Sequence, residues 1–200
     1  MSANSQPLSN FQILRLAWKI AGGTRGFFKS WDFFWSLLLL AICYPAWSIQ
    51  GWWNQPIAAL PTMLGFTLGG FAIFLGFGND NFKEAIVDGN ELKSLYLSVS
   101  AAFLIFVAFQ VVALLYALAA SALWFPTPKF LTAAAPFIEN FGNPICWALG
   151  YFLFLYSITC SLRAALRIFR VSRWYNSFLV FAAEQRQQAE ARANALKNSR

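Results

Sequence analysis

Histidine is absent from this 200-residue chain, and Asp and Glu together number only eight. Without imidazole, the chain lacks the usual physiological proton shuttle and a principal zinc ligand, so most catalytic triads and zinc sites are excluded. The phosphate-cradling pattern GxxxxGK[ST] is also missing. The sequence therefore predicts that the protein is not an enzyme, and it predicts no metal ion and no cofactor.

Charge is missing altogether from three long stretches, Phe33 to Asn79, Ser94 to Pro128 and Asn140 to Leu162. Only 12% of the residues are charged and 58% are hydrophobic, whereas soluble domains have roughly 25% charged residues. About 20 apolar residues suffice to cross a hydrocarbon core ~30 Å thick. Since hydrocarbon offers backbone amides no water, such segments are helices. The sequence predicts an all-α, multi-pass membrane protein.

The first apolar stretch is long enough for two spans, because polar and turn-forming residues interrupt it at Gln50-Gly51 and at Asn54-Gln55-Pro56. Four transmembrane helices are therefore expected, near 33–53, 57–78, 97–124 and 145–166. They make up a transmembrane domain over 31–174, between an N-terminal segment, 1–30, and a helical C-terminal tail, 175–200. Because no acidic residue lies inside a span, ion-coupled transport is disfavoured.

Lysine and arginine gather before the first predicted span and from the end of the last span onward. The segment between the first two spans carries no charge, and the segment after the third carries only Lys129. We expect a protein of the cell inner membrane, and the positive-inside rule predicts that both of its termini lie in the cytoplasm. Tryptophans favour the membrane–water interface. Trp52 and Trp53 are expected at the outer interface and Trp174 at the inner one, which agrees with this topology.

The N-terminal segment is predicted to hold an amphipathic helix at 11–21, capped by Ser9 or Asn10 and ended by a glycine pair. Arg15 and Lys19 fall on one face of this helix, and its other faces are apolar. One interpretation places the helix in the membrane interface, with its apolar side chains at the headgroup boundary. The alternative is a helix packed under the bundle.

Small residues recur on one face of the second predicted span at spacings of four, three and four: Gly65, Gly69, Ala72 and Gly76. Such a stripe lets the backbone of another helix approach closely. It favours a helix–helix seam, and a gating hinge is the other interpretation. In the third span, Gln110 shares a face with Ala113 and Ala117. An amide in hydrocarbon needs a partner, so Gln110 either bonds a neighbouring helix or lines a pore.

Two stripes of opposite charge are expected on the cytoplasmic side. Asp80, Glu84 and Asp88 would form an acidic stripe if their segment is helical, and the end of the fourth span carries the basic set Arg163, Arg167, Arg170 and Arg173. The stripes could pair with each other, within or between subunits, or the arginines could contact a protein partner. Solvated faces and contacts with lipid phosphate are the alternatives.

Two classes of function fit these features. The first is a membrane anchor or sensor subunit that forms homo-oligomers through its small-residue seams and docks a cytoplasmic protein. The second is a channel or membrane-perturbing effector in which several copies surround a pore. The spans show no polar stripe of the kind that lines a permanently open pore, which favours the first class. The lipid bilayer is a partner in both, and no direct contact with nucleic acid is expected.

In size, number of predicted spans and basic cytoplasmic ends, the chain resembles the small four-span inner-membrane proteins of bacterial phage-defence cassettes, such as those of the Kiwa system. The segment LPTMLGFTLGG, Leu60 to Gly70, is the candidate signature. The resemblance is one of layout, and it implies a role in antiviral defence without assigning a role to any residue.

Overall fold

The computed structural model of the chain describes residues 9–76, 95–123 and 142–198. Within these ranges the chain forms helices and no strand, so the all-α prediction is confirmed. The helices are α1 (Asn10–Ile20), α2 (Gly23–Phe28), α3 (Trp31–Ile42), α4 (Tyr44–Trp47), α5 (Asn54–Gly76), α7 (Leu95–Ala122) and α9 (Asn143–Asn198).

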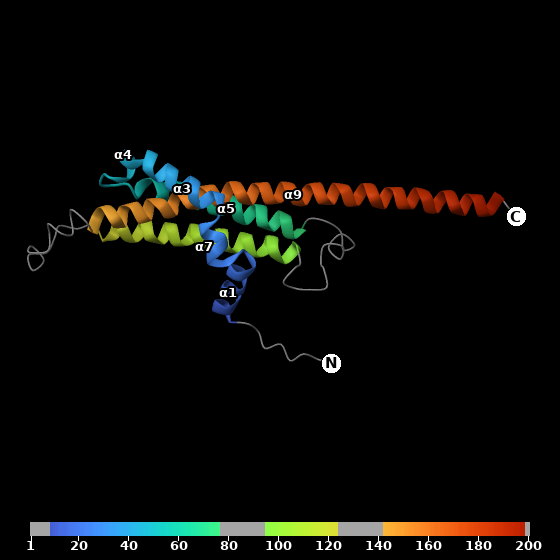
Figure 1. The fold of residues 1–200 in the computed structure, drawn as a ribbon, viewed down its shortest axis with the longest axis horizontal. Helices are drawn as coiled ribbons and strands as arrows, with labels where there is room; N and C mark the ends of the chain where they lie inside the picture. The colour runs from blue at the N-terminus through green and yellow to red at the C-terminus, as the bar shows by residue number, and fades with distance from the viewer. Residues whose placement is uncertain (1–8, 77–94, 124–141, 199–200) are drawn as a thin grey trace, which may run out of the picture.

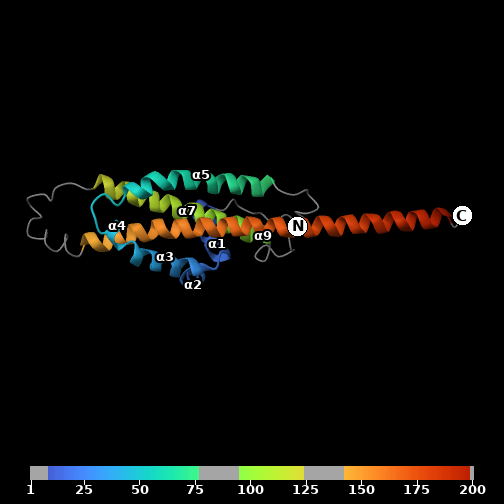
Figure 2. The same ribbon diagram turned by 90° about the horizontal axis from the view of Figure 1, so that it is seen from above.

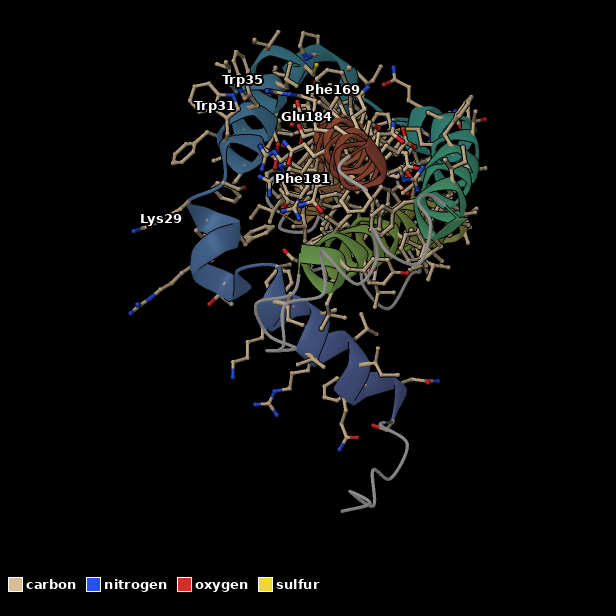
Figure 3. All side chains as sticks on the ribbon, turned by 90° about the vertical axis from the view of Figure 1, so that its right-hand side faces the viewer. Lys29, Trp31, Trp35, Phe169, Phe181 and Glu184 are labelled. Atoms are coloured by element: carbon tan, nitrogen blue, oxygen red, sulfur yellow. The ribbon has the colours of Figure 1, made fainter. Side chains whose placement is uncertain are left out.

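A bundle of long helices forms the centre of the structure (Figures 1 and 2). The helix α9 packs against α3, α5 and α7, and α5 also packs against α7. In the view along α9, α3 lies on one side, α5 on the other and α7 below (Figure 3). Three helices of the described part, α5, α7 and α9, are long and apolar enough to cross a membrane.

The region predicted as the first span, 33–53, differs from the expectation of one continuous helix. Helix α3 ends at Ile42 after 12 residues, α4 has four residues, and turns follow until Asn54. Pro45 explains the break, because proline lacks the N–H that would bond the carbonyl four residues back, and its ring clashes with that carbonyl. At 1.5 Å per residue, α3 alone is roughly 18 Å long.

The predicted helix at 11–21 corresponds to α1 within one residue at each end. Ser9 caps it with a capping box, in which its hydroxyl accepts from the Gln12 N–H and its own N–H donates to the Gln12 side chain. Gly22 ends the helix at a φ of 111°, in the left-handed region that favours glycine. Helix α1 projects from the bundle and packs against α7 (Figure 1).

The last helix, α9, is a single element of 56 residues, from Asn143 to Asn198. It joins the predicted span at 145–166 and the predicted helical tail into one rod about 84 Å long at 1.5 Å per residue. Its second half runs past the end of the bundle to the C-terminus (Figure 1). No break separates the part that packs in the bundle from the part that projects.

Two aromatic-rich clusters fill the bundle. One gathers around Phe103, Phe106 and Tyr156, and the other around Trp52 and Tyr151. The two adjacent tryptophans were expected at the membrane interface, yet Trp52 is only 2% exposed and Trp53 only 7%. They lie in the core because the turn after α4 folds them back against α7 and α9, where Trp52 meets Tyr116 and Tyr151.

Candidate functional site: a polar seam along α9

Four polar side chains at alternate positions of α9, Ser157, Thr159, Ser161 and Arg163, form what we call the polar seam. Residues four apart lie on the same helix face, so the seam divides into two pairs. Thr159 and Arg163 contact α3, whereas Ser161, one turn after the buried Ser157, contacts α7. One segment of α9 thus makes polar contacts with two neighbouring helices.

The α3 side of the seam is an antiparallel contact with matched register. Asp32 forms an ion pair with Arg163, and one turn further along, the hydroxyls of Ser36 and Thr159 lie 3.0 Å apart. Ser36 is fully buried and also donates to the Asp32 carbonyl at 2.6 Å. Since Asp32 is only 8% exposed, the guanidinium supplies the countercharge that its carboxylate needs away from water.

Gln110 joins three helices from the other side of the seam. Its side-chain nitrogen donates to Thr67 of α5 at 3.0 Å and to Ser161 of α9 at 2.9 Å, and the residue is 0% exposed. Ala113 and Ala117, on the same face of α7, are each 1% exposed. The Gln110 oxygen has no hydrogen-bond partner in the described ranges. Gln110 is therefore an interhelical contact within one chain.

The small-residue stripe of α5 lies on an open face of the bundle. A Cβ added at Gly65, Gly69 or Gly76 would meet nothing within 4 Å, and Ala72 is exposed. Gly70 is the position that approaches α9, since its added Cβ would lie 3.2 Å from Ile168. A groove of about 430 Å³ runs beside the stripe. The stripe is thus not a seam inside the described part of this chain.

The predicted basic face is divided by its contacts. Arg163 is in the ion pair with Asp32, and Arg167 donates to the Ser98 carbonyl of α7 at 3.4 Å. Arg170 and Arg173 are exposed. The predicted acidic stripe, Asp80, Glu84 and Asp88, lies outside the described residues. The first two arginines of the set therefore contact the bundle, and the last two face outward.

Sequence reasoning did not identify Asp32 as the partner of Arg163, although it is the lone acidic residue near the start of the first apolar stretch. It also missed Gly150, where an added Cβ would clash with the Trp52 ring and lie 2.6 Å from Tyr116 Cε1. The signal for Gly150 was weak, because an isolated glycine in a membrane helix is common. Both positions fix how neighbouring elements pack on α9.

Comparison of the chain with protein-family models, with curated proteins and with solved structures finds no match. The polar groups of the bundle are engaged with one another between helices, as at Gln110 and at the Asp32–Arg163 pair. Such contacts fix the rotation and register of packed helices. The arrangement gives a bundle of defined register that holds one end of a long projecting helix.

Proposed function

We propose that the protein is an anchor or sensor subunit of the cell inner membrane that docks a cytoplasmic protein. The observation that carries this proposal is the continuity of α9 from the bundle to Asn198. A rigid helix held at one end by packing transmits its position and orientation to its free end. The proposal needs no catalytic residue and no cofactor.

The projecting half of α9 has the surface of a docking helix. Glu184, Arg186 and Glu190 are exposed along it, and Phe181 adds an exposed apolar side chain (Figure 3). A helix can bind a partner through apolar anchors flanked by charges. Arg170 and Arg173, exposed where α9 leaves the bundle, would meet an acidic surface of the partner.

A fourth membrane crossing, made by α3 and α4 together, is part of this proposal. Helix α3 begins beside Arg163, and α4 packs in the cluster of Tyr151 near the other end of the bundle. The two helices together extend roughly 25 Å at 1.5 Å per residue. Trp31 and Trp35 point away from the bundle (Figure 3), where tryptophan side chains would anchor α3 in the interface.

Four crossings place both termini on the same side, and the basic ends favour the cytoplasm. Reporter fusions test this topology. A fusion after Arg200 and one within 79–96 should be cytoplasmic, whereas one within 129–143 should be external. An external signal from the 79–96 fusion would contradict the arrangement, and three crossings would place the two termini on opposite sides.

The proposed homo-oligomer uses the open stripe of α5. Gly65 and Gly69 present backbone without side chains on a face that this chain leaves uncovered. In lipid, helices associate through such faces because close backbone approach gains van der Waals contact. A second copy that packs on this stripe would also cover the exposed Phe66 and Ile73.

A truncation after Phe178 tests the docking proposal, because it removes the projecting helix and leaves in place the core contacts of α9, which extend to Phe178. Native mass spectrometry of mild detergent extracts should show a soluble protein with the full chain and lose it with the truncation. Arg170→Glu with Arg173→Glu should also release the partner while membrane insertion is unchanged. If the truncated protein retains the same partner, the proposal that the projecting part of α9 binds this partner is wrong.

A channel is the second candidate, and one observation favours it. A cavity of about 280 Å³ lies between α5, α7 and α9, and its lining includes the Thr67 and Ser161 hydroxyls that Gln110 bridges. Polar groups at such a cavity could line a hydrophobically gated pore between copies. Reproducible single-channel currents from the purified protein alone in a planar bilayer would favour the channel over the anchor.

Phage defence is the biological setting that we propose from the resemblance in layout. The supporting features are the predicted spans and the basic ends of the chain. Deletion of the gene from its natural host should raise the plating efficiency of some phages, and the intact gene should restore resistance. If deletion leaves the plating efficiency of a broad panel of phages unchanged, the role in phage defence is wrong. The membrane-anchor proposal does not depend on this result.

A further inference from the structure

A crevice of about 340 Å³ lies between α1 and α7, outside the polar seam. Its α1 wall includes Phe11, Leu14, Arg15 and Trp18, and Ala108 and Phe109 contribute from α7. All of the lining side chains except Arg15 are apolar. Phe11 is 76% exposed, so the apolar surface of α1 is only partly covered by the bundle.

The position of α1 along α7 matches the edge of a bilayer. Ala17 of α1 packs against Ala101 and Ile105 of α7, and α1 leaves the bundle at a steep angle (Figure 1). From Ile105 to the end of α7 at Ala122, the helix extends roughly 26 Å at 1.5 Å per residue. That length is close to one hydrocarbon thickness of ~30 Å. When Ala122, at the end of α7, lies at one surface of the bilayer, α1 therefore lies among the lipid headgroups of the opposite surface.

The charge around the crevice is entirely positive. Residues 9–30 contain Arg15, Lys19, Arg25 and Lys29 and no Asp or Glu. In the described part of the chain, none of these four cations forms an ion pair with an acidic side chain. Arg15 and Lys19 are one turn apart on the exposed side of α1. The segment therefore offers positive charge that the acidic side chains of residues 9–76, 95–123 and 142–198 do not neutralise.

We propose that the crevice holds an acyl chain of an anionic phospholipid whose phosphate is bound by Arg15 and Lys19. Apolar walls beside the exposed cations Arg15 and Lys19 match a molecule with an apolar chain and an anionic headgroup. An apolar helix from a second copy fits less well, because it would cover Arg15 without supplying a countercharge. This inference needs only that the chain lies in a bilayer, so it stands apart from the docking proposal.

The test uses the purified full chain in mild detergent, mixed with equal amounts of phosphatidylglycerol and phosphatidylcholine that carry the same acyl chains. Native mass spectrometry then measures which lipid stays bound. Phosphatidylglycerol should be retained in preference to phosphatidylcholine. Ala108→Trp should fill the crevice and remove most of this bound lipid. Ala119→Trp is the matched control, since Ala119 is exposed on the same helix and does not line the crevice.

A second pair of variants tests the charge. Arg15→Gln should reduce phosphatidylglycerol retention about fivefold, the effect of losing one cation near an anionic headgroup. Arg186→Gln, on the projecting part of α9, removes the same charge far from the crevice and should leave phosphatidylglycerol retention at the parent value. Because Arg15 is exposed, Arg15→Gln should fold, and it therefore tests the lipid site even if Ala108→Trp does not fold. Equal retention of the two lipids by the parent, or parent-like retention by Arg15→Gln, overturns the proposal.

Discussion

The ion pair between Asp32 and Arg163 joins the first turn of α3 to the part of α9 that packs in the bundle. The side chains are 11% and 28% exposed, respectively, so neither charge is fully hydrated. One turn away, Ser36 and Thr159 meet in the same antiparallel register. A shift of one residue along either helix would separate both the ion pair and the hydroxyl pair. This contact therefore fixes the position of α3 along α9.

Removal of one charge from this pair should destabilise the bundle. We expect Asp32→Ala to lower the free energy of unfolding by roughly 2 kcal/mol, because Arg163 is left half-buried without its countercharge. Unfolding in mixed micelles of mild detergent and dodecyl sulfate measures the change. The double variant Asp32→Leu with Arg163→Leu should be more stable than Asp32→Ala, since no unpaired charge remains. Arg173→Leu, at an exposed position, is the control and should have little effect.

Gln110 should contribute less to stability than its full burial suggests. Thr67 and Ser161 each donate to a carbonyl of their own helix, so they keep those bonds when Gln110 is lost. Gln110→Leu should therefore cost about 1 kcal/mol of unfolding free energy, as for other interhelical hydrogen bonds in membranes. Gln110→Glu should cost more at neutral pH, because it buries a carboxylate. If Gln110→Leu prevents folding, the hydrogen bonds of Gln110 contribute more to the stability of the bundle than we infer.

Gly150 should tolerate no side chain. An alanine Cβ there would clash with Trp52 and approach Tyr116 to 2.6 Å, and overpacking of this kind costs roughly 1 to 3 kcal/mol. Gly150→Ala should lower the unfolding midpoint in the same micelle assay. Gly76→Ala, where an added Cβ meets nothing within 4 Å, is the matched control in another helix and should be neutral or stabilising. Equal midpoints for the two variants would mean that Trp52 does not pack on Gly150.

Most of the helices could be predicted from the sequence, because charge-free apolar runs of sufficient length have few other structures available in hydrocarbon. The predicted bounds of α5 and α7 agree with the structure to within three residues. The break at Pro45 was harder to predict. Proline is tolerated in the first turn of a helix, as at Pro45 in α4, but also inside a membrane helix, as at Pro61 in α5. The sequence does not distinguish the two positions.

The pairing of polar side chains could not be read from one sequence. The need of Gln110 for a partner was clear, but Thr67 and Ser161 lie 43 and 51 residues away. Which of many hydroxyls meets the amide depends on the rotation of each helix, which is set by packing of the whole bundle. For the same reason, Arg163 was grouped with its neighbours on α9, and its partner Asp32, on a different helix, was missed.

The open stripe of α5 gives a prediction that separates packing within the chain from packing between copies. Gly69→Leu adds bulk where the chain itself offers no neighbour within 4 Å, so folding of the monomer should be unchanged. If a second copy packs on this face, the added side chain should hold the two backbones apart and dissociate the oligomer. Size-exclusion chromatography with light scattering measures the mass, and the micelle assay measures the stability.

The control for this variant is Leu118→Phe, which adds bulk at an exposed position of α7, away from the stripe. It should leave both oligomer mass and stability at the parent values, whereas Gly69→Leu should reduce the mass alone. A loss of stability with Gly69→Leu would place the stripe inside the fold of one chain. An unchanged mass with unchanged stability would instead mean that the stripe faces lipid, because only lipid can accommodate the leucine without displacing a protein backbone.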